Sequence, residues 1–287
     1  MISDGEKMKR AIAVYLDYTR GLLQQFACLY TSYKYINCSQ DTDLVVFGPK
    51  VSLDLVPDDC IKVELNPLGG IWKTYRFINS ISCVGSEQAE FLNSYDYVLR
   101  TDVDTFLTPA WNTYIPDYYS VGRGAYAGEE VNKNTKRVAQ KLNVRHQGIH
   151  NVGSTHYGAS SLVRDVCNLS VEIAYYLLTK EFAVYGGAWP GWYRGVTSMY
   201  STEIALNHLV DVIDIRPDQL DFDSTSTNSI YDHSHIHCWH TDNLFSKFKY
   251  GDGLYDHMLQ DFESDEIRQY CLNIGLEAKK KLPRLFI

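Results

Sequence analysis

The stretch YDYVLRTDVDTFLTP, residues 95–109, is an apolar run that stops at two closely spaced aspartates. Residues 95–100 are typical of a buried strand, and Asp102 and Asp104 follow directly at its end. Two neighbouring carboxylates repel one another, and burying them without compensation is costly. A hard divalent cation such as Mg²⁺ or Mn²⁺ prefers oxygen ligands and would compensate both charges. The stretch therefore predicts a metal site at the end of a strand.

Strands and helices alternate in the sequence that precedes this stretch. Apolar, β-branched runs predict strands at residues 11–18, 42–48 and 60–65. Helical spacing and capping patterns predict helices at residues 21–36, 71–84 and 86–94. Such alternation forms right-handed βαβ units. We expect an α/β fold with a mostly parallel central sheet flanked by helices, and ligands bind outside the carboxyl ends of such strands.

After residue 110 the alternation is less regular. Loops rich in glycine and aromatic residues are predicted at 119–128, 148–158 and 185–195, helices at 160–180 and 201–211, and a strand at 236–240. The chain has no internal repeat, no low-complexity linker and no break in composition. Residues 1–287 are therefore expected to form a single domain.

Composition limits the possible partners and the cell compartment. The net charge is −8 and no long basic run precedes the C-terminal KKKLPR, so nucleic acid is not an expected partner. The seven cysteines are odd in number and form no CxxC pair, which argues against a disulfide framework or a zinc ribbon. We find no signal peptide and no apolar stretch near the roughly 18 to 20 residues of a transmembrane segment. A cytoplasmic location is expected.

Two known kinds of site resemble the aspartate pair without matching it. An EF-hand loop needs further oxygen ligands and a glycine, which Thr105, Phe106 and Leu107 do not supply. A haloacid-dehalogenase-type phosphatase would use Asp102 as its nucleophile, but Phe106 occupies the fifth position of the motif, far from the N-terminus. The EF-hand is excluded, and the phosphatase stays open as an alternative.

A third pattern fits better. The segment YDYVLRTDVDTFL resembles the DVD segment of retaining GT-A glycosyltransferases related to the blood-group and α-1,3-galactosyl enzymes. The resemblance implies a GT-A (Rossmann-like) fold, with a nucleotide-binding half at 1–110 and an acceptor-binding half at 111–287. It also implies that Asp104 and Asp102 hold Mn²⁺ or Mg²⁺ on the diphosphate of a nucleotide sugar. Such a metal neutralises charge on the departing diphosphate.

Two later segments add to this resemblance. In STEIALN, residues 201–207, the pattern implies that Glu203 lies beside the anomeric carbon and acts in catalysis together with Asp102. The alternative is that Glu203 is simply favoured in the first turn of a helix by the helix dipole. The segment HSHIHCWHTDNLFSKFKYG, residues 233–251, implies a metal-binding histidine, His237 or His240, and a phosphate contact from Lys247.

Other cations and aromatic residues are candidates for substrate contacts. Lys73, Arg76 and Arg100 are near enough to the motifs to pair with a diphosphate, Arg76 first among them, or they form surface salt bridges. The resemblance implies that the end of the first strand holds the nucleotide base and ribose, through Tyr15, Asp17 and Tyr18.

The acceptor is expected at the later loops. The sequence YGGAWPGWYRG, residues 185–195, presents Trp189, Trp192 and Tyr193, whose ring faces suit sugar C–H faces. His156 lies in HNVGSTHYGAS, residues 150–160, beside small residues that would admit a hexose. Either loop could instead be a rigid turn with buried aromatic side chains.

These observations predict a metal-dependent glycosyltransferase. It would transfer a hexose from a UDP- or GDP-sugar to a glycan hydroxyl, with retention of configuration, as a soluble enzyme of bacterial or viral type. Two alternatives remain: the phosphatase that uses Asp102 as its nucleophile, and a sugar-binding protein that needs a metal but has no catalytic activity.

Overall fold

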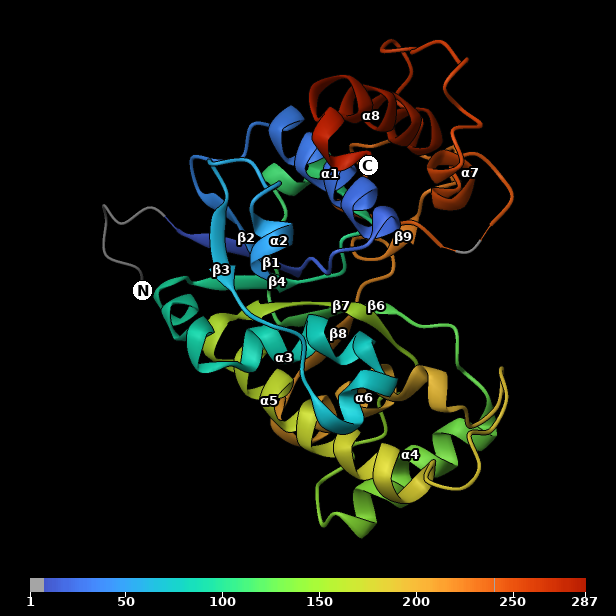
Figure 1. The fold of residues 1–287 in the computed structure, drawn as a ribbon. Helices are drawn as coiled ribbons and strands as arrows, with labels where there is room; N and C mark the ends of the chain where they lie inside the picture. The colour runs from blue at the N-terminus through green and yellow to red at the C-terminus, as the bar shows by residue number, and fades with distance from the viewer. Residues whose placement is uncertain (1–7, 240) are drawn as a thin grey trace.

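The computed structural model describes residues 8–239 and 241–287, and its centre is a seven-stranded sheet between two layers of helices (Figure 1). The strand order is β3-β2-β1-β4-β7-β6-β8. Most neighbouring strands are parallel, whereas β7 runs antiparallel to both β4 and β6. The strands span β1 Arg10–Tyr15, β2 Thr42–Gly48, β3 Ile61–Glu64, β4 Tyr97–Arg100, β6 Tyr119–Arg123, β7 Val152–Ala159 and β8 Ile213–Ile215.

The first strand explains why helices cover both faces of the sheet. Ile12 and Val14 of β1 belong to one hydrophobic core, and Ala11, Ala13 and Tyr15 belong to a second. Successive side chains of a strand point to opposite faces, so a continuous apolar run requires cover on both sides. The expectation of an α/β fold with a mostly parallel sheet flanked by helices is confirmed.

The helices divide between these two cores. On the face of Ile12, core residues come from α1 (Arg20–Tyr35), α2 (Lys50–Leu53), α7 (Lys247–Gly251) and α8 (Ile267–Lys281). On the other face they come from α3 (Asn79–Gly85), α4 (Glu129–Lys141), α5 (Ser160–Tyr176) and α6 (Thr197–Leu209). Figure 1 shows α1 and α8 on one side of the sheet and α3, α5 and α6 on the other.

A small second sheet joins the end of the chain to the aspartate motif. Its strand order is β5-β10-β9, with β5 at Thr105–Leu107, β9 at Phe222–Asp223 and β10 at His235–His237. β10 pairs antiparallel with β5, and His237 lies opposite Thr105. This pairing brings the histidine segment next to Asp104.

Several sequence expectations differ from the structure. Residues 148–158, expected as a loop, include most of β7, because small residues and buried side chains there pack inside the sheet rather than at its edge. The helix expected at 71–84 is broken into 3₁₀ turns at Gly70–Thr74 and Arg76–Ile78 followed by α3, and the helix expected at 86–94 is a 3₁₀ helix at Glu87–Ser94. Residues 119–128, also expected as a loop, begin with β6 at Tyr119–Arg123. Helices α4 and α8 were not expected from the sequence.

Short helical turns complete the description. They are 3₁₀ turns at Pro109–Asn112, Arg194–Val196 and Pro283–Leu285, and a π-helical turn at Leu177–Glu181 that continues α5. Throughout the described residues, every helix is too short or too polar to pass through a lipid bilayer.

Candidate metal and nucleotide site

The two aspartates lie in the turn between β4 and β5, directly beyond the carboxyl end of a central strand. Arg100, the last residue of β4, is buried and fixes this turn. Its Nη2 donates to Asp102 Oδ1 at 2.9 Å, and its Nε donates to the Ser80 carbonyl at 2.9 Å. The Thr105 hydroxyl donates to the Asp102 carbonyl at 2.9 Å, which closes the turn. Arg100 is therefore a structural anchor of the aspartate pair.

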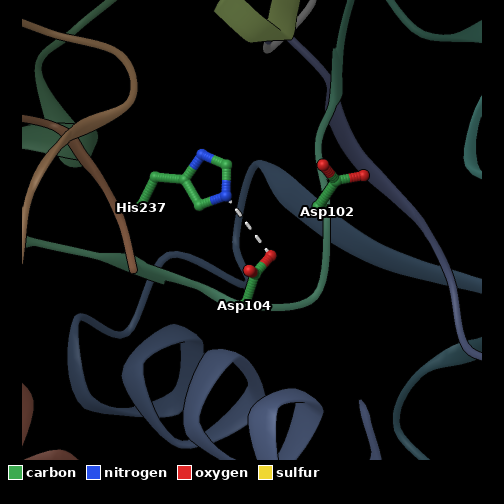
Figure 2. Close-up of side chains that lie close together, drawn as sticks. All are labelled: Asp102, Asp104 and His237. Atoms are coloured by element: carbon green, nitrogen blue, oxygen red, sulfur yellow. Dashed lines mark ion pairs between the residues drawn. The ribbon is translucent and has the colours of Figure 1, made fainter. Parts of the chain in front are cut away.

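His237 completes a cluster of three possible metal ligands. One ligand atom from each of Asp102, Asp104 and His237 lies within 4.8 Å of the others. Figure 2 shows the His237 ring facing Asp104, with Asp102 further along the same turn. His237 Nε2 is 3.4 Å from Asp104 Oδ1, and Lys247 Nζ is 2.6 Å from Asp104 Oδ2. In the part of the chain that the structure describes, no other such cluster is found.

Neighbouring opposite charges shift the pKa values of Asp104 and His237. Burial would raise the pKa of the Asp104 carboxyl, but His237 and Lys247 hold it well below its ordinary value. Burial would likewise lower the pKa of His237, but attraction to Asp104 and hydrogen bonds to Asp104 and Asp221 raise it to about 10. Two cationic side chains thus occupy the two oxygens of Asp104. A divalent cation could take the same position, because two carboxylates and an imidazole suit Mn²⁺ or Mg²⁺.

A cavity of about 960 Å³ opens onto this cluster. A cavity of this size is typical of sites for nucleotide-sized ligands. The sequence-predicted residues that line it are Tyr15, Asp17, Arg76, Arg100, Asp102, Asp104, His156, Trp189, His237 and Lys247. Tyr18, Lys73, Trp192, Tyr193 and Glu203 are absent from its lining, and His240 lies outside the described residues.

The nucleotide candidates divide between the cavity and the surface. Arg76 is largely exposed, and its Nη1 lies 3.7 Å from Asp17 Oδ2, so a weak surface ion pair leaves it free to meet a ligand. The Tyr15 hydroxyl donates to the Leu65 carbonyl at 3.4 Å while the residue lines the cavity. Tyr18 and Lys73 lie on the exposed surface outside the cavity.

The acceptor candidates divide in the same way. Trp189 is 50% exposed and lines the cavity. Trp192 stacks on the Tyr200 ring at a centroid distance of 4.5 Å, and it packs partly buried against the hydrophobic core. Tyr193 lies outside the cavity lining and contacts Tyr200 through its backbone N–H. The packing of Trp192 is thus closer to the alternative of a turn with packed aromatic side chains, with its ring partly buried.

His156 reaches the cavity from the interior of β7. It is 2% exposed, and its Nδ1 lies 3.2 Å from the Tyr119 hydroxyl. Burial, together with the charge of Arg100, lowers the pKa of His156 to about 3, so the ring is neutral. His156 therefore lines the cavity as a neutral side chain held in a strand, and not as part of a loop.

Glu203, in α6, is absent from the cavity lining. It lies against the loop that precedes β7. Its side chain is fully buried, and Oε1 lies 2.9 Å from His150 Nδ1. Oε2 accepts the Asn151 backbone N–H at 2.7 Å. This carboxylate therefore fixes the loop before β7, and it lies beside Tyr126, whose side chain lines the cavity. A catalytic role of Glu203 stays a prediction.

Among the cavity residues that the sequence patterns did not indicate, four have side chains suited to ligand binding. Phe77 is 69% exposed and Trp239 is 42% exposed, and both line the cavity as Trp189 does. Arg123 lines it at the end of β6, and Asp221 lies beneath His237. Trp239, two residues after His237, carried a usable signal, whereas the other three come from segments with no recognisable motif.

Comparison with known protein families gives one match. Residues 4–282 match a family model described as a domain of unknown function (DUF7164). No curated protein matches the sequence significantly. Because the family model covers nearly the whole chain, the protein belongs to the DUF7164 family.

Proposed function

We propose that this protein is a metal-dependent glycosyltransferase with a GT-A domain, which transfers a hexose from a nucleoside-diphosphate sugar to a glycan hydroxyl. The observation that supports the proposal best is the convergence of Asp102, Asp104 and His237 at a cavity of about 960 Å³. Asp102 and Asp104 follow the carboxyl end of β4, which is the edge at which α/β sheets bind ligands. His237 joins them from β10.

In this proposal the chain holds the donor by its diphosphate. Asp102, Asp104 and His237 would bind Mn²⁺ or Mg²⁺, which when bound neutralises the charge of the departing diphosphate. Lys247, which contacts Asp104 at 2.6 Å, would donate to a diphosphate oxygen once Asp104 is engaged. Arg76 lines the same cavity and would supply a second positive charge.

Aromatic side chains support a substrate with flat or ring-shaped parts. Phe77, Trp189 and Trp239 line the cavity and are substantially exposed. Their faces would stack on a base or pack against the C–H face of a hexose. Exposed rings of this size in one cavity favour a carbohydrate-containing substrate over a small phosphate ester, and so favour the transferase over the phosphatase alternative.

The proposal includes retention of configuration. Retention rests on the sequence resemblance, and Glu203 does not line the cavity. The cavity carboxylates among the described residues are Asp17, Asp102, Asp104 and Asp221. The anomeric configuration of the product, measured by NMR, decides between retention and inversion.

The proposal is tested with a panel of nucleotide sugars in Mn²⁺ and in EDTA. We expect one donor to raise the melting temperature only with metal, because a ligand that binds the folded state stabilises it. We expect the same donor to be consumed in Mn²⁺ and not in EDTA.

Asp104→Asn should abolish both effects, whereas Asp58→Asn, at a fully exposed carboxylate outside the cavity, should preserve them. Metal-dependent binding of a glycan without donor consumption would favour the sugar-binding alternative. Hydrolysis of p-nitrophenyl phosphate that depends on Asp102 would favour the phosphatase.

A further inference from the structure

Asp221 is a buried carboxylate directly behind the candidate metal ligand His237. It is 5% exposed and precedes β9, with a backbone φ of 56° in the left-handed region. Its Oδ1 lies 3.2 Å from His237 Nδ1 and accepts the Thr155 hydroxyl at 2.5 Å. Its Oδ2 accepts the Thr155 backbone N–H at 3.1 Å. Asp221 thus has a left-handed backbone and is buried, and its carboxylate is held against His237 Nδ1.

The sheet leaves room for this carboxylate at two glycines. A Cβ added to Gly122 would lie 2.0 Å from Asp221 Oδ2, and a Cβ added to Gly153 would lie 2.3 Å from the same oxygen. Gly122 is in β6 and Gly153 is in β7, so two neighbouring strands lack side chains where Asp221 inserts. Any larger residue at either position would displace the carboxylate from His237.

We propose that Asp221 is the positioning residue of the metal site, and that it keeps the proton of His237 on Nδ1 so that Nε2 presents its lone pair to the metal. This inference rests on the proposed function. A metal-binding histidine generally donates its other ring N–H to a carboxylate or carbonyl, which fixes both tautomer and ring orientation. Here Nδ1 faces Asp221 and Nε2 faces Asp104, 3.4 Å away, in the arrangement that this role requires.

Hydrogen bonding explains why an aspartate, rather than its amide, is needed. The Thr155 backbone N–H can only donate, so an amide at position 221 would turn its oxygen toward that group. The NH₂ would then face His237 Nδ1 and donate to it. The ring proton would move to Nε2, where it blocks the lone pair that the metal needs.

A relay to a nucleophile does not fit the same contacts. The Ser154 hydroxyl lies 3.5 Å from His237 Nδ1, the nitrogen that also faces Asp221. A serine–histidine–aspartate relay needs the hydroxyl and the carboxylate on opposite ring nitrogens. The second nitrogen, Nε2, faces Asp104 instead.

The test measures metal binding directly, without donor or activity. We expect Asp221→Asn to bind Mn²⁺ about 10- to 100-fold more weakly than the wild type by calorimetry. In pulsed EPR of the Mn²⁺-loaded protein, the ¹⁴N coupling from a bound histidine should be present in the wild type and lost in Asp221→Asn. Asp223→Asn, at an exposed neighbour in β9 whose carboxylate contacts Thr225, should retain wild-type affinity and coupling.

The outcomes separate the two proposals. A wild type that binds no Mn²⁺ would contradict the proposed function. A wild type that binds Mn²⁺, with equal affinity and equal ¹⁴N coupling in Asp221→Asn, would overturn only the role of Asp221. If Asp221→Asn does not fold, ¹⁵N NMR of the Mg²⁺-loaded wild type decides: an Nδ1–H tautomer of His237, assigned with His237→Gln, supports the inference, and an Nε2–H tautomer overturns it.

Discussion

At the scale of single residues, the site is a chain of alternating charges. Lys247 pairs with Asp104, Asp104 with His237, and His237 with Asp221. Asp221 is buried and Asp104 is partly buried, and each lies beside a cation, so neither charge is left without compensation. A divalent ion that binds here must replace the proton of His237 and the ammonium of Lys247, and metal affinity is therefore coupled to their charge.

This coupling predicts how stability depends on pH without metal. The pKa of His237 in the folded protein is raised from 6.5 to about 10, so its ion pairs stabilise the fold fully below pH 6.5. That contribution is lost as the pH rises toward 10. In EDTA, the free energy of unfolding should fall over this window by on the order of a few kcal/mol more in the wild type than in His237→Gln. Equal pH profiles of the two proteins would contradict a raised pKa of His237 in the folded protein.

A second residue-scale prediction concerns Glu203. Its carboxylate accepts the Asn151 N–H at 2.7 Å and contacts His150 at 2.9 Å, and the residue is absent from the cavity lining. Glu203→Gln should therefore lower the free energy of unfolding by about 1–3 kcal/mol, measured in urea. The kcat of the folded variant should remain near the wild-type value. A large loss of kcat with unchanged stability would instead restore Glu203 as a catalytic residue.

Sequence patterns located some of these residues and not others. Asp102 and Asp104 were predictable because an apolar strand that ends in two carboxylates is unusual locally. His237 was predictable as one of two candidates, from a dense histidine segment. Asp221 left no local signal, because its role depends on a left-handed backbone and on glycines in β6 and β7, which only the fold brings together.

At the scale of elements, the short pairing of β5 with β10 determines the geometry of the site. β5 carries the aspartate turn at its start and β10 ends at His237. Helix α8 contacts β5 of this strand pair, since the Tyr270 hydroxyl donates to the Leu107 carbonyl at 2.6 Å. The strand expected at 236–240 is β10 at His235–His237, and residue 240 lies outside the described residues. Its partner β5 was not expected, because strands this short carry little pattern of their own.

The support from α8 can be measured. Tyr270→Phe removes a buried hydroxyl and leaves the Leu107 carbonyl without this donor, so the free energy of unfolding should fall by about 1–2 kcal/mol in urea. Tyr118→Phe is the matched control, at an exposed tyrosine whose hydroxyl forms no hydrogen bond with the described residues. We also expect weaker Mn²⁺ binding in Tyr270→Phe only. Equal stability of the two variants would contradict a supporting role of α8.

The central strand β7 shows why element prediction failed in the later part of the chain. Gly153 and Gly158 interrupt its apolar pattern, and glycine is usually a turn residue. In the structure a Cβ at Gly158 would lie 2.8 Å from the Tyr119 ring, so the glycine permits close packing between β7 and β6. A residue that serves tertiary packing thus resembled a loop residue in the sequence.

At the scale of the whole molecule, the cavity is built from both parts of the chain. Tyr15, Asp17 and Arg76 line it from the first part, and Trp189, His237 and Lys247 line it from the second. The predicted division into a nucleotide half and an acceptor half stays a prediction. The α/β class followed from the alternation before residue 110, whereas the return of residues 235–251 to the aspartate turn depended on long-range pairing.

The most direct test of the account is a crystal structure with Mn²⁺ and the nucleoside diphosphate selected by the thermal-shift panel, examined for anomalous scattering from manganese. We predict one manganese peak bound by Asp102, Asp104 and His237 Nε2, with diphosphate oxygens completing its coordination. Manganese absent from this position while the nucleotide is bound, or Asp102 and Asp104 turned toward bulk solvent, would contradict the central claim.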